Sequence, residues 1–419
     1  MPDLHLAYAN SAELVRLLAD WDARIEQEPI ARHQWTDLSL WPAARSATVA
    51  GSTAIEGNRL TPAQVGEVLA GGQVEAARAD IREVLNYNAA LDLANRAALR
   101  PVFEWSGELI QRLNATVMRD LENDERGEYR HDAVTVGNAY HPPEWQRVPG
   151  LMSELVDWLR DPTETHPLIL AGLAHLNVVS IHPWLDGNGR TARIAGSLML
   201  MRCGIGAPEL LNVESELRAS RDRYYAVLQE AQGLNYEPAE RSATAWLEYF
   251  ARICVDRLDA RNRVLNALPN DIGLLSMELS QDRRASADWP AILLGARLAP
   301  LRTSRLADTL GLSAARTRAM LAAMTAAGWL TPLGERRGRR YGPSDRLLSL
   351  ELRTPALMDQ LLVAETRREP VQTTLPLTWT VSGSATSTRP QQPSVQSPPA
   401  ARVIGEGRAP STSVSSADS

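Results

Sequence analysis

The chain's chemically capable side chains are concentrated in the segment Ile-His-Pro-Trp-Leu-Asp-Gly-Asn-Gly-Arg-Thr-Ala-Arg, residues 181–193. His182 has an ordinary pKa near ~6.5, which suits a general base at neutral pH. Asp186 offers the hard carboxylate oxygen that Mg²⁺ prefers. Arg190 and Arg193 stand three residues apart, so both guanidinium groups of a helix can face one anion. These residue types and spacings predict a site that binds a polyphosphate and moves a proton beside it.

Two helices joined by a short loop would position these groups. Pro183 pushes His182 out of helical conformation, so one helix should end there. Gly187 and Gly189 allow backbone N–H groups to come close to a ligand. The free N–H groups and the positive dipole end of the second helix then form a site for an anion. Helical patterns are predicted over residues 42–56, 104–122, 149–159, 167–181 and 189–203.

The composition is that of a globular protein of two or three domains, with 419 residues, 44% apolar residues and a net charge of −6. All 44 basic residues are Arg, which excludes P-loop, protein-kinase and pyridoxal-phosphate chemistry because each needs a Lys. Two cysteines, Cys203 and Cys254, are too few for a disulfide framework or a zinc cluster. Since neither a leader pattern nor an apolar run of 18 residues is found, we expect a cytoplasmic protein without a membrane partner.

The segment around His182 resembles the signature of the Fic family, His-Pro-Phe-x-[Asp/Glu]-Gly-Asn-Gly-Arg-x-x-Arg. The eight matching positions are His182, Pro183, Asp186, Gly187, Asn188, Gly189, Arg190 and Arg193. The chain departs from the signature at Trp184, where the family has Phe, and we expect the larger ring to keep the role of an apolar anchor. The resemblance implies a mainly α fold, with a Fic-type helical core over residues 103–255 and a small β-hairpin flap.

The resemblance also implies an activity. Most family members transfer AMP from ATP to a hydroxyl group of a target protein, which here would be a Ser, Thr or Tyr side chain, and release pyrophosphate. By that analogy His182 takes the proton from the hydroxyl, and Asp186 holds the Mg²⁺ that bridges the phosphates. The ATP and Mg²⁺ requirements are therefore expectations from the family.

Further positions match the family around the nucleotide. The phosphate-binding residues that the resemblance implies are Gly187, Asn188, Gly189, Arg190 and Arg193, with Arg193 on the γ-phosphate. Tyr224 and Tyr225, in the sequence Arg-Tyr-Tyr, resemble the family's tyrosines near the base pocket, although two tyrosines on a helix are more often core residues. A hairpin predicted over residues 135–148 falls where the family has its flap. His175 is expected to be a packed histidine rather than a metal ligand.

A second pattern upstream resembles the family's inhibitory motif, [Ser/Thr]-x-x-x-Glu-[Gly/Asn]. It is found at Ser52, Glu56 and Gly57, at the end of the helix predicted over residues 42–56. A carboxylate at this place can form a bidentate pair with Arg193 and so remove the partner of the γ-phosphate. The alternative is that Glu56 is an ordinary surface carboxylate that closes a helix.

Residues 290–345 have the pattern of a winged helix, in which Gly311 ends one helix and Ser313 caps the next. Two strands are predicted at residues 329–331 and 340–341, around an Arg-rich turn at 334–339. Residues 301–345 hold eight Arg against three acidic residues, a net charge of +5, so this domain could bind DNA. A winged helix used for packing or protein contacts is the alternative.

The predicted organisation has four parts. These are an N-terminal helical region with the inhibitory helix (1–102), the Fic core (103–255), linker helices with a winged-helix domain (256–365), and a disordered tail rich in Pro, Ser and Thr (366–419). The leading hypothesis is an autoinhibited protein adenylyltransferase. The alternatives are the same fold using another nucleotide or removing AMP, and a DNA-binding regulator. A homodimer is suggested by family analogy alone.

Overall fold

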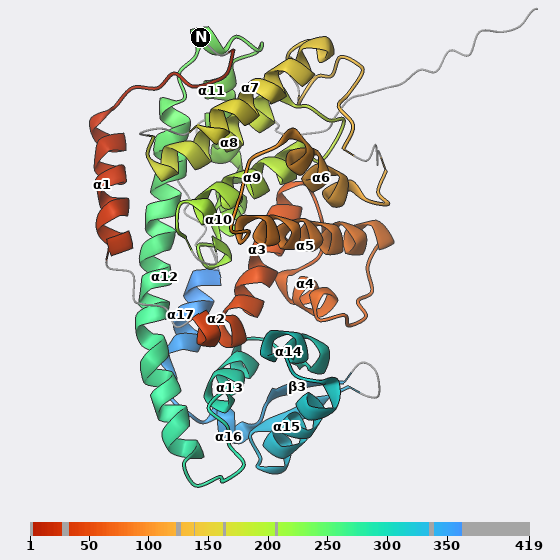
Figure 1. Cartoon of the computed structure of the whole chain (residues 1–419), viewed down its shortest axis with the longest axis vertical. Helices are drawn as coiled ribbons and strands as arrows, with labels where there is room; N and C mark the ends of the chain where they lie inside the picture. The colour runs from red at the N-terminus through yellow and green to blue at the C-terminus, as the bar shows by residue number, and fades with distance from the viewer. Residues whose placement is uncertain are drawn as a thin grey trace, which may run out of the picture. The chain divides into compact units, whose positions relative to one another are not determined.

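The fold is built around two adjacent helices, α8 (Pro167–Ile181) and α9 (Asn188–Arg202), joined by the loop with the histidine motif. Both agree with the predicted ranges to within one residue. Residues 168–181 of α8 are all buried, as expected for a helix that other helices enclose on every side. Its neighbours include α7 (Val148–Arg160) and α12 (Thr244–Leu279), as Figure 1 shows. The loop is thus held by a helix whose residues 168–181 are all buried.

The computed structural model describes residues 3–26, 33–122, 127–137, 139–161, 165–205, 208–334 and 339–362. The tail predicted to be disordered, 366–419, lies outside the described residues. Within the described ranges, no helix is both long and apolar enough to cross a membrane. The helices outside these two and those described below are α1 (Ala12–Glu26), α2 (His33–Ser39), α5 (Arg78–Ala98), α6 (Gly107–Met118), α11 (Arg221–Gln232), α16 (Asp345–Leu348) and the short 3₁₀ helices η1 (Trp145–Arg147), η2 (Pro208–Leu210) and η3 (Pro238–Glu240).

Helix α3 (Trp41–Ile55) carries the inhibitory pattern at its C-terminal end, as predicted. It packs closely against α10 (Val213–Ala219) at Gly51, where an added Cβ would lie 2.8 Å from the backbone carbon of Glu214. Such a distance is shorter than real Cβ contacts, so this crossing requires a glycine. Gly57, with φ +102°, then turns the chain away from the helix.

Helix α4 (Pro62–Leu69) begins with a side-chain cap at Thr61. The hydroxyl oxygen of Thr61 accepts from the backbone N–H of Gln64, and the Gln64 side chain accepts from the N–H of Thr61. This reciprocal capping box fixes the turn after α3. Helices α3 and α4 therefore form a pair whose direction is set by local sequence.

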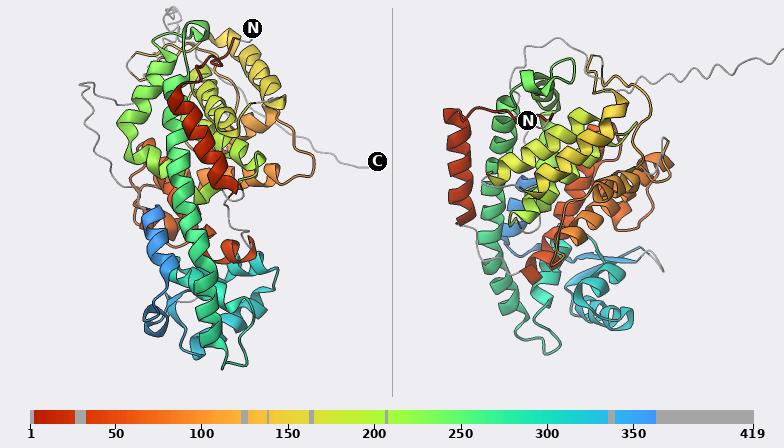
Figure 2. Two further views of the ribbon diagram at one scale, coloured as in Figure 1. Left: turned by 90° about the vertical axis from the view of Figure 1, so that its left-hand side faces the viewer. Right: turned by 45° about the horizontal axis from the view of Figure 1, so that its top comes forward.

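Helix α12 is 36 residues long and links the two hydrophobic cores of the chain. It contacts α1 and α8 at one end and α13 (Trp289–Leu298) and α17 (Arg353–Leu362) at the other, as the views in Figure 1 and Figure 2 show. The boundary proposed between residues 255 and 256 lies inside this continuous helix.

The two helices predicted from the winged-helix pattern are present in the structure. Helix α14 (Thr303–Leu310) ends at Gly311, which has φ +62°. The hydroxyl of Ser313 caps α15 (Ala314–Ala326) by accepting from the N–H of Arg316 at 3.3 Å. These two helices therefore follow from the turn and cap residues alone.

A small antiparallel sheet completes this region. It has three strands in the order β1 (Leu301–Arg302), β3 (Arg340–Pro343) and β2 (Leu330–Leu333), with Leu301 opposite Tyr341. The two predicted strands are confirmed. Strand β1 was not predicted, because two residues are too few to show alternation. Most of the predicted Arg-rich turn, residues 335–338, lies outside the described residues.

The predicted hairpin over residues 135–148 is wrong in its extent. The structure has one antiparallel bridge, Val136 with Tyr140, and then a parallel bridge between His141 and Asn235. Pro142 and Pro143 follow at once, and because proline lacks an N–H the ladder cannot continue. The segment is a turn that one residue pair closes, and it is followed by η1 rather than by a second strand.

Candidate active site

His182 ends α8 in an unusual backbone conformation. Its φ of +49° and ψ of +59° lie in the left-handed region, which non-glycine residues adopt at a cost. The guanidinium group of Arg130 holds this turn, since its Nε donates to the His182 carbonyl at 2.9 Å, and the Arg130 backbone N–H donates to Pro183. Arg130 is buried, and its role was not predicted from the sequence. Its signal was only an arginine in a turn-rich segment.

The His182 ring is buried and suited to accept a proton. Burial lowers the pKa of His182 to about 4, so the ring is neutral at neutral pH. Its Nδ1 lies 3.3 Å from the Val179 carbonyl. A proton on Nδ1 satisfies that carbonyl and leaves Nε2 as the basic atom.

The loop after His182 is closed by Trp184 and Asn188. The indole Nε1 of Trp184 donates to the Gly127 carbonyl at 2.9 Å, a contact that a Phe could not make. The Asn188 side chain accepts from the Trp184 N–H and donates to its carbonyl, at 3.1 and 2.8 Å. Trp184 is 2% exposed, so the expected anchoring role of the ring is what the structure shows. Asn188 therefore shapes the loop through its side chain.

Gly187 stands at the start of α9 with φ +79°, and a Cβ there would lie 2.8 Å from Asn114 Nδ2. The Asp186 carboxylate accepts from the Gly187 N–H and from Arg190 Nη2, the latter at 2.9 Å. Arg190 also donates to Glu83 at 2.7 Å. Its side chain thus holds two carboxylates in this structure, and its predicted role in phosphate binding stays a prediction. Glu83 gave no recognisable signal in the sequence.

Arg193 is bound by the helix with the inhibitory pattern. Its Nη2 donates to Glu56 Oε1 at 2.7 Å and to the Ser52 carbonyl at 3.1 Å, while its Nε donates to the Ser52 hydroxyl at 2.8 Å. The side chain of Arg193 is 2% exposed and that of Glu56 is 27% exposed. Burial acts against the charge on Glu56, but Arg193 and Arg190 outweigh it and hold its pKa below the usual range. The predicted contact between Glu56 and Arg193 is therefore present.

These residues line one small cavity of about 80 Å³. Its wall contains every predicted site residue except Ser52, Gly57 and Arg190, and it adds four residues that were not predicted as site residues: Val136, Gly137, Val179 and Leu228. The carboxylate of Glu56 lies over Gly189, where a Cβ would come 2.6 Å from Oε1. The cavity is far below the ~300–1,000 Å³ of small-molecule sites, because Glu56 fills the space beside the helix start.

The two tyrosines flank this cavity from α11. The Tyr224 hydroxyl lies 2.9 Å from His175 Nε2, and Tyr225 donates to the Ile55 carbonyl at 3.5 Å. His175 is buried with its ring 4.9 Å from that of Trp246, so it is a packed histidine, as predicted. Tyr224 and Tyr225 are thus both core residues and cavity residues.

Asp186 could hold a metal ion only with help from a ligand. Within the described ranges, no group of three His, Cys, Asp or Glu side chains could bind a metal ion. The Asp186 side chain is 41% exposed, at the start of α9. One carboxylate next to an anion site suits Mg²⁺, which usually takes its other ligands from phosphates and water. The donor set therefore fits a magnesium ion that arrives with a triphosphate.

The fold and this loop define a mainly helical protein with a Fic-type site. Residues 104–200 match the model of the Fic/DOC family, so the chain contains a Fic/DOC family domain. The chain is 34% identical over 185 residues to the protein adenylyltransferase fic-1 of Caenorhabditis briggsae, covering 43% of this chain and 35% of that protein. It is 31% identical over 229 residues to the protein adenylyltransferase Fic of Drosophila willistoni, covering 54% and 43%.

A solved structure also resembles the chain. A Fic family protein from Desulfovibrio desulfuricans G20 has 25% sequence identity and a TM-score of 0.55, with 82% of this chain and 98% of that chain covered. The chain is thus distantly related to protein adenylyltransferases and shares a Fic-like fold. It spans less than half the length of the two curated relatives above.

Proposed function

We propose that this chain is an autoinhibited protein adenylyltransferase that transfers AMP from ATP to a hydroxyl side chain of a target protein. The observation that carries the proposal is the 2.7 Å pair between Arg193 and Glu56 beside His182. The pair occupies the cation that a terminal phosphate needs, and it leaves a cavity of about 80 Å³. Glu56 must therefore withdraw before a nucleoside triphosphate can enter.

In the active form, Arg193 would bind the γ-phosphate through its freed Nη2. The start of α9 at Gly187 and Gly189 would cradle the phosphates with backbone N–H groups. Mg²⁺ held by Asp186 would neutralise charge that develops on the phosphate oxygens. Tyr224 and Tyr225 would lie on the side of the base, away from the helix start. Each of these roles uses a residue that lines the described cavity.

The transfer is an in-line displacement at the α-phosphorus. The target hydroxyl oxygen forms a bond to phosphorus while the bond from phosphorus to the bridging oxygen breaks, and pyrophosphate leaves with that electron pair. His182 Nε2 accepts the hydroxyl proton, which its neutral state at pH 7 allows. General-base catalysis of this kind contributes about 10²–10⁴-fold, and charge stabilisation with positioning supplies the rest.

Labelled ATP tests the proposal in the variant Glu56→Gly, which lacks the inhibitory carboxylate; the pair of Glu56 with Arg193 is called the brake below. We expect protein in a lysate, or the chain itself, to take up label from α-³²P-ATP and none from γ-³²P-ATP. His182→Ala should abolish labelling while ATP still binds. His131→Ala is the matched control, since His131 is exposed and should leave labelling intact.

Each outcome of this experiment bears on one step. Uptake of the γ-label would mean phosphate transfer rather than AMP transfer. Labelling of His182→Ala at the parent rate would remove His182 as the base. If Glu56→Gly takes up no label from any nucleoside triphosphate, the transferase proposal is wrong.

A further inference from the structure

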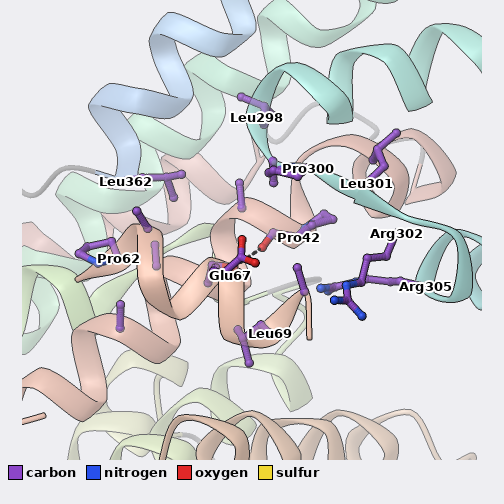
Figure 3. A pocket seen from close by; sticks show the side chains of 18 of the residues that line it. Pro42, Pro62, Glu67, Leu69, Leu298, Pro300, Leu301, Arg302, Arg305 and Leu362 are labelled. Carbon is purple, nitrogen blue, oxygen red and sulfur yellow. Dashed lines mark hydrogen bonds between the residues drawn. The ribbon is translucent and has the colours of Figure 1, made fainter. Parts of the chain in front are cut away.

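A second, much larger cavity lies between the inhibitory helix and the winged-helix region. Its volume is about 920 Å³, within the ~300–1,000 Å³ range of small-molecule sites. Helices α3 and α4 form one side, and α13, β1 and α14 form the other, as Figure 3 shows. Apolar side chains make much of the wall, among them Pro42, Leu69, Leu298, Pro300 and Leu362. None of these groups belongs to the site around His182.

The charged side chains of this cavity favour an anion. Four arginines and two acidic residues line it: Arg218, Arg302, Arg305, Arg340, Asp37 and Glu67. Glu67 is already bonded to Arg340 Nη1. Arg340, which begins the second predicted strand of the basic winged-helix region, is therefore already paired. The excess of positive charge therefore rests on the other arginines.

Arg302 has hydrogen-bonding capacity that the protein does not use. Its Nε and Nη2 atoms are buried and have no hydrogen-bond partner in the part of the chain that the structure describes. Buried donors of this kind are rare in folded proteins, because each unmade bond costs free energy. A guanidinium group binds a carboxylate, sulfonate or phosphate through two parallel hydrogen bonds. Arg302 thus presents the donors that such a group would satisfy.

Arg305 stands beside Arg302 on the same side of the cavity, and both side chains project into it (Figure 3). The guanidinium carbon of Arg305 lies 4.7 Å from the centre of the Trp41 ring, a cation–π contact that orients it. Trp41 is the first residue of α3, so the arginine rests on the inhibitory helix itself. The cavity thus has a cationic end and apolar walls.

We propose that this cavity binds a small amphipathic anion, with its acidic group on Arg302 and Arg305 and its apolar body against the proline and leucine walls. The ligand needs both the acidic group and the apolar body. An inorganic anion would leave the apolar walls in contact with water, and an uncharged molecule would leave the Arg302 donors unpaired.

The cavity and the catalytic site share helix α3. Pro42, Ser46 and Ala50 line the cavity, and Glu56 follows the same helix at its other end. A ligand in the cavity contacts α3 in the position that places Glu56 on Arg193, so it favours that position. The anion is therefore an inhibitor that strengthens the brake, and this step alone rests on the proposed function.

A pair of fluorescent probes tests the binding site without any activity. 1-Anilinonaphthalene-8-sulfonate has an apolar body with a sulfonate, and N-phenyl-1-naphthylamine has the same body without it. Arg302→Met should weaken binding of the sulfonate about tenfold or more and leave the uncharged probe nearly unchanged. Arg112→Met is the matched control, because Arg112 is exposed on α6, away from the cavity, and should change neither.

A steric variant gives an independent test. Gly66 lines the cavity from α4, and a Cβ there would meet its nearest atom, Ser46 Oγ, at 3.8 Å. Gly66→Leu should therefore place a branched side chain in the cavity and weaken binding of both probes, whereas Gly66→Ala adds only the Cβ and should leave binding in place. Circular dichroism and thermal melting confirm that each variant is folded. Equal sulfonate affinity in the wild type, Arg302→Met and Gly66→Leu would overturn the site.

The coupling to α3 is tested separately from the site. With Glu56 present, saturating sulfonate probe should lower self-labelling from α-³²P-ATP several-fold, and Gly66→Leu should remove the effect. With Glu56→Gly, the probe should bind equally well and no longer inhibit. Probe binding without any loss of labelling in the wild type would overturn the coupling through α3. Failure of labelling in Glu56→Gly would instead count against the proposed function and leave the probe results standing.

Discussion

Replacement of Glu56 by glycine should activate the chain, and the structure gives the expected size of the effect. The substitution removes the carboxylate that accepts from Arg193 Nη2 at 2.7 Å. Ser52 still holds Nε of Arg193 through its hydroxyl group, so the guanidinium stays in place. Arg193 then keeps its orientation and gains a free donor toward the γ-phosphate.

The gain in ATP affinity follows from that single donor. A hydrogen bond between charged groups contributes about 1.5–3 kcal/mol, and each ~1.4 kcal/mol changes an equilibrium constant tenfold. Because the Glu56 side chain is 27% exposed, solvent weakens its hold on Arg193, and the lower part of this range applies. We expect Glu56→Gly to bind ATP about tenfold more tightly. Labelling from α-³²P-ATP should rise by at least as much.

Titration calorimetry with ATP and Mg²⁺, together with the labelling assay, measures both effects. Glu56→Gln keeps the size of the side chain and loses its charge, so it should give a smaller gain. Adding Arg193→Ala should remove the gain of Glu56→Gly, since both act through one guanidinium. The brake would be refuted if Glu56→Gly bound ATP no better than the wild type, or if the double variant kept the full gain.

Two stability predictions complete the set. Gly187→Ala should lower the free energy of unfolding by about 2 kcal/mol or more, because φ is +79° and the new Cβ would crowd Asn114. Gly150 has open space around it, so Gly150→Ala should not destabilise the protein. Urea unfolding of the two variants measures the difference. Burial lowers the pKa of three histidines to about 4, 3 and 4 respectively: His5, His175 and His182. Below pH ~6.5 the unfolded chain therefore binds more protons than the folded chain. The stability present above that pH should fall by up to about 1.4 kcal/mol per pH unit per histidine as the pH drops toward about 4. One proton on Glu214 opposes this loss, because burial raises the pKa of Glu214 to about 7. A urea midpoint that stays constant between about pH 7 and pH 5 would contradict the dominance of the histidines.

The helices around the site could be predicted because residues close in sequence determine where each helix begins and ends. Pro183, Gly187 and the Thr61-Pro62 cap act within one turn, and the structure places helix ends there to within a residue or two. The loop chemistry was equally local, since the His182 motif spans only twelve residues. Features that depend on residues this close in sequence can be predicted without knowledge of the rest of the chain.

Contacts between distant segments could not be predicted, because side-chain direction depends on packing. The spacing of Arg190 allowed it to face an anion, yet Glu83 on α5 and Asp186 bind it first. Arg340 similarly stood in a basic cluster of sequence and is bonded to Glu67 on α4. In both cases an acidic residue from an element outside the motif decided where the guanidinium points. Charge clusters in a sequence therefore do not by themselves locate a ligand.

The Arg193–Glu56 pair lies between these two cases. Only the resemblance to a known inhibitory pattern joined the two residues, which are 137 positions apart. Their 2.7 Å contact depends on how far α3 reaches into the site, and Gly51 sets that reach by letting α3 approach the backbone of α10. The proposed autoinhibition thus depends on the position of helix α3, which is fixed at Gly51 against α10 and at the wall of the large cavity. If the proposals hold, a change at either the α10 crossing or the large cavity should move the same carboxylate, and an effect on the proposed AMP transfer should then originate far from His182.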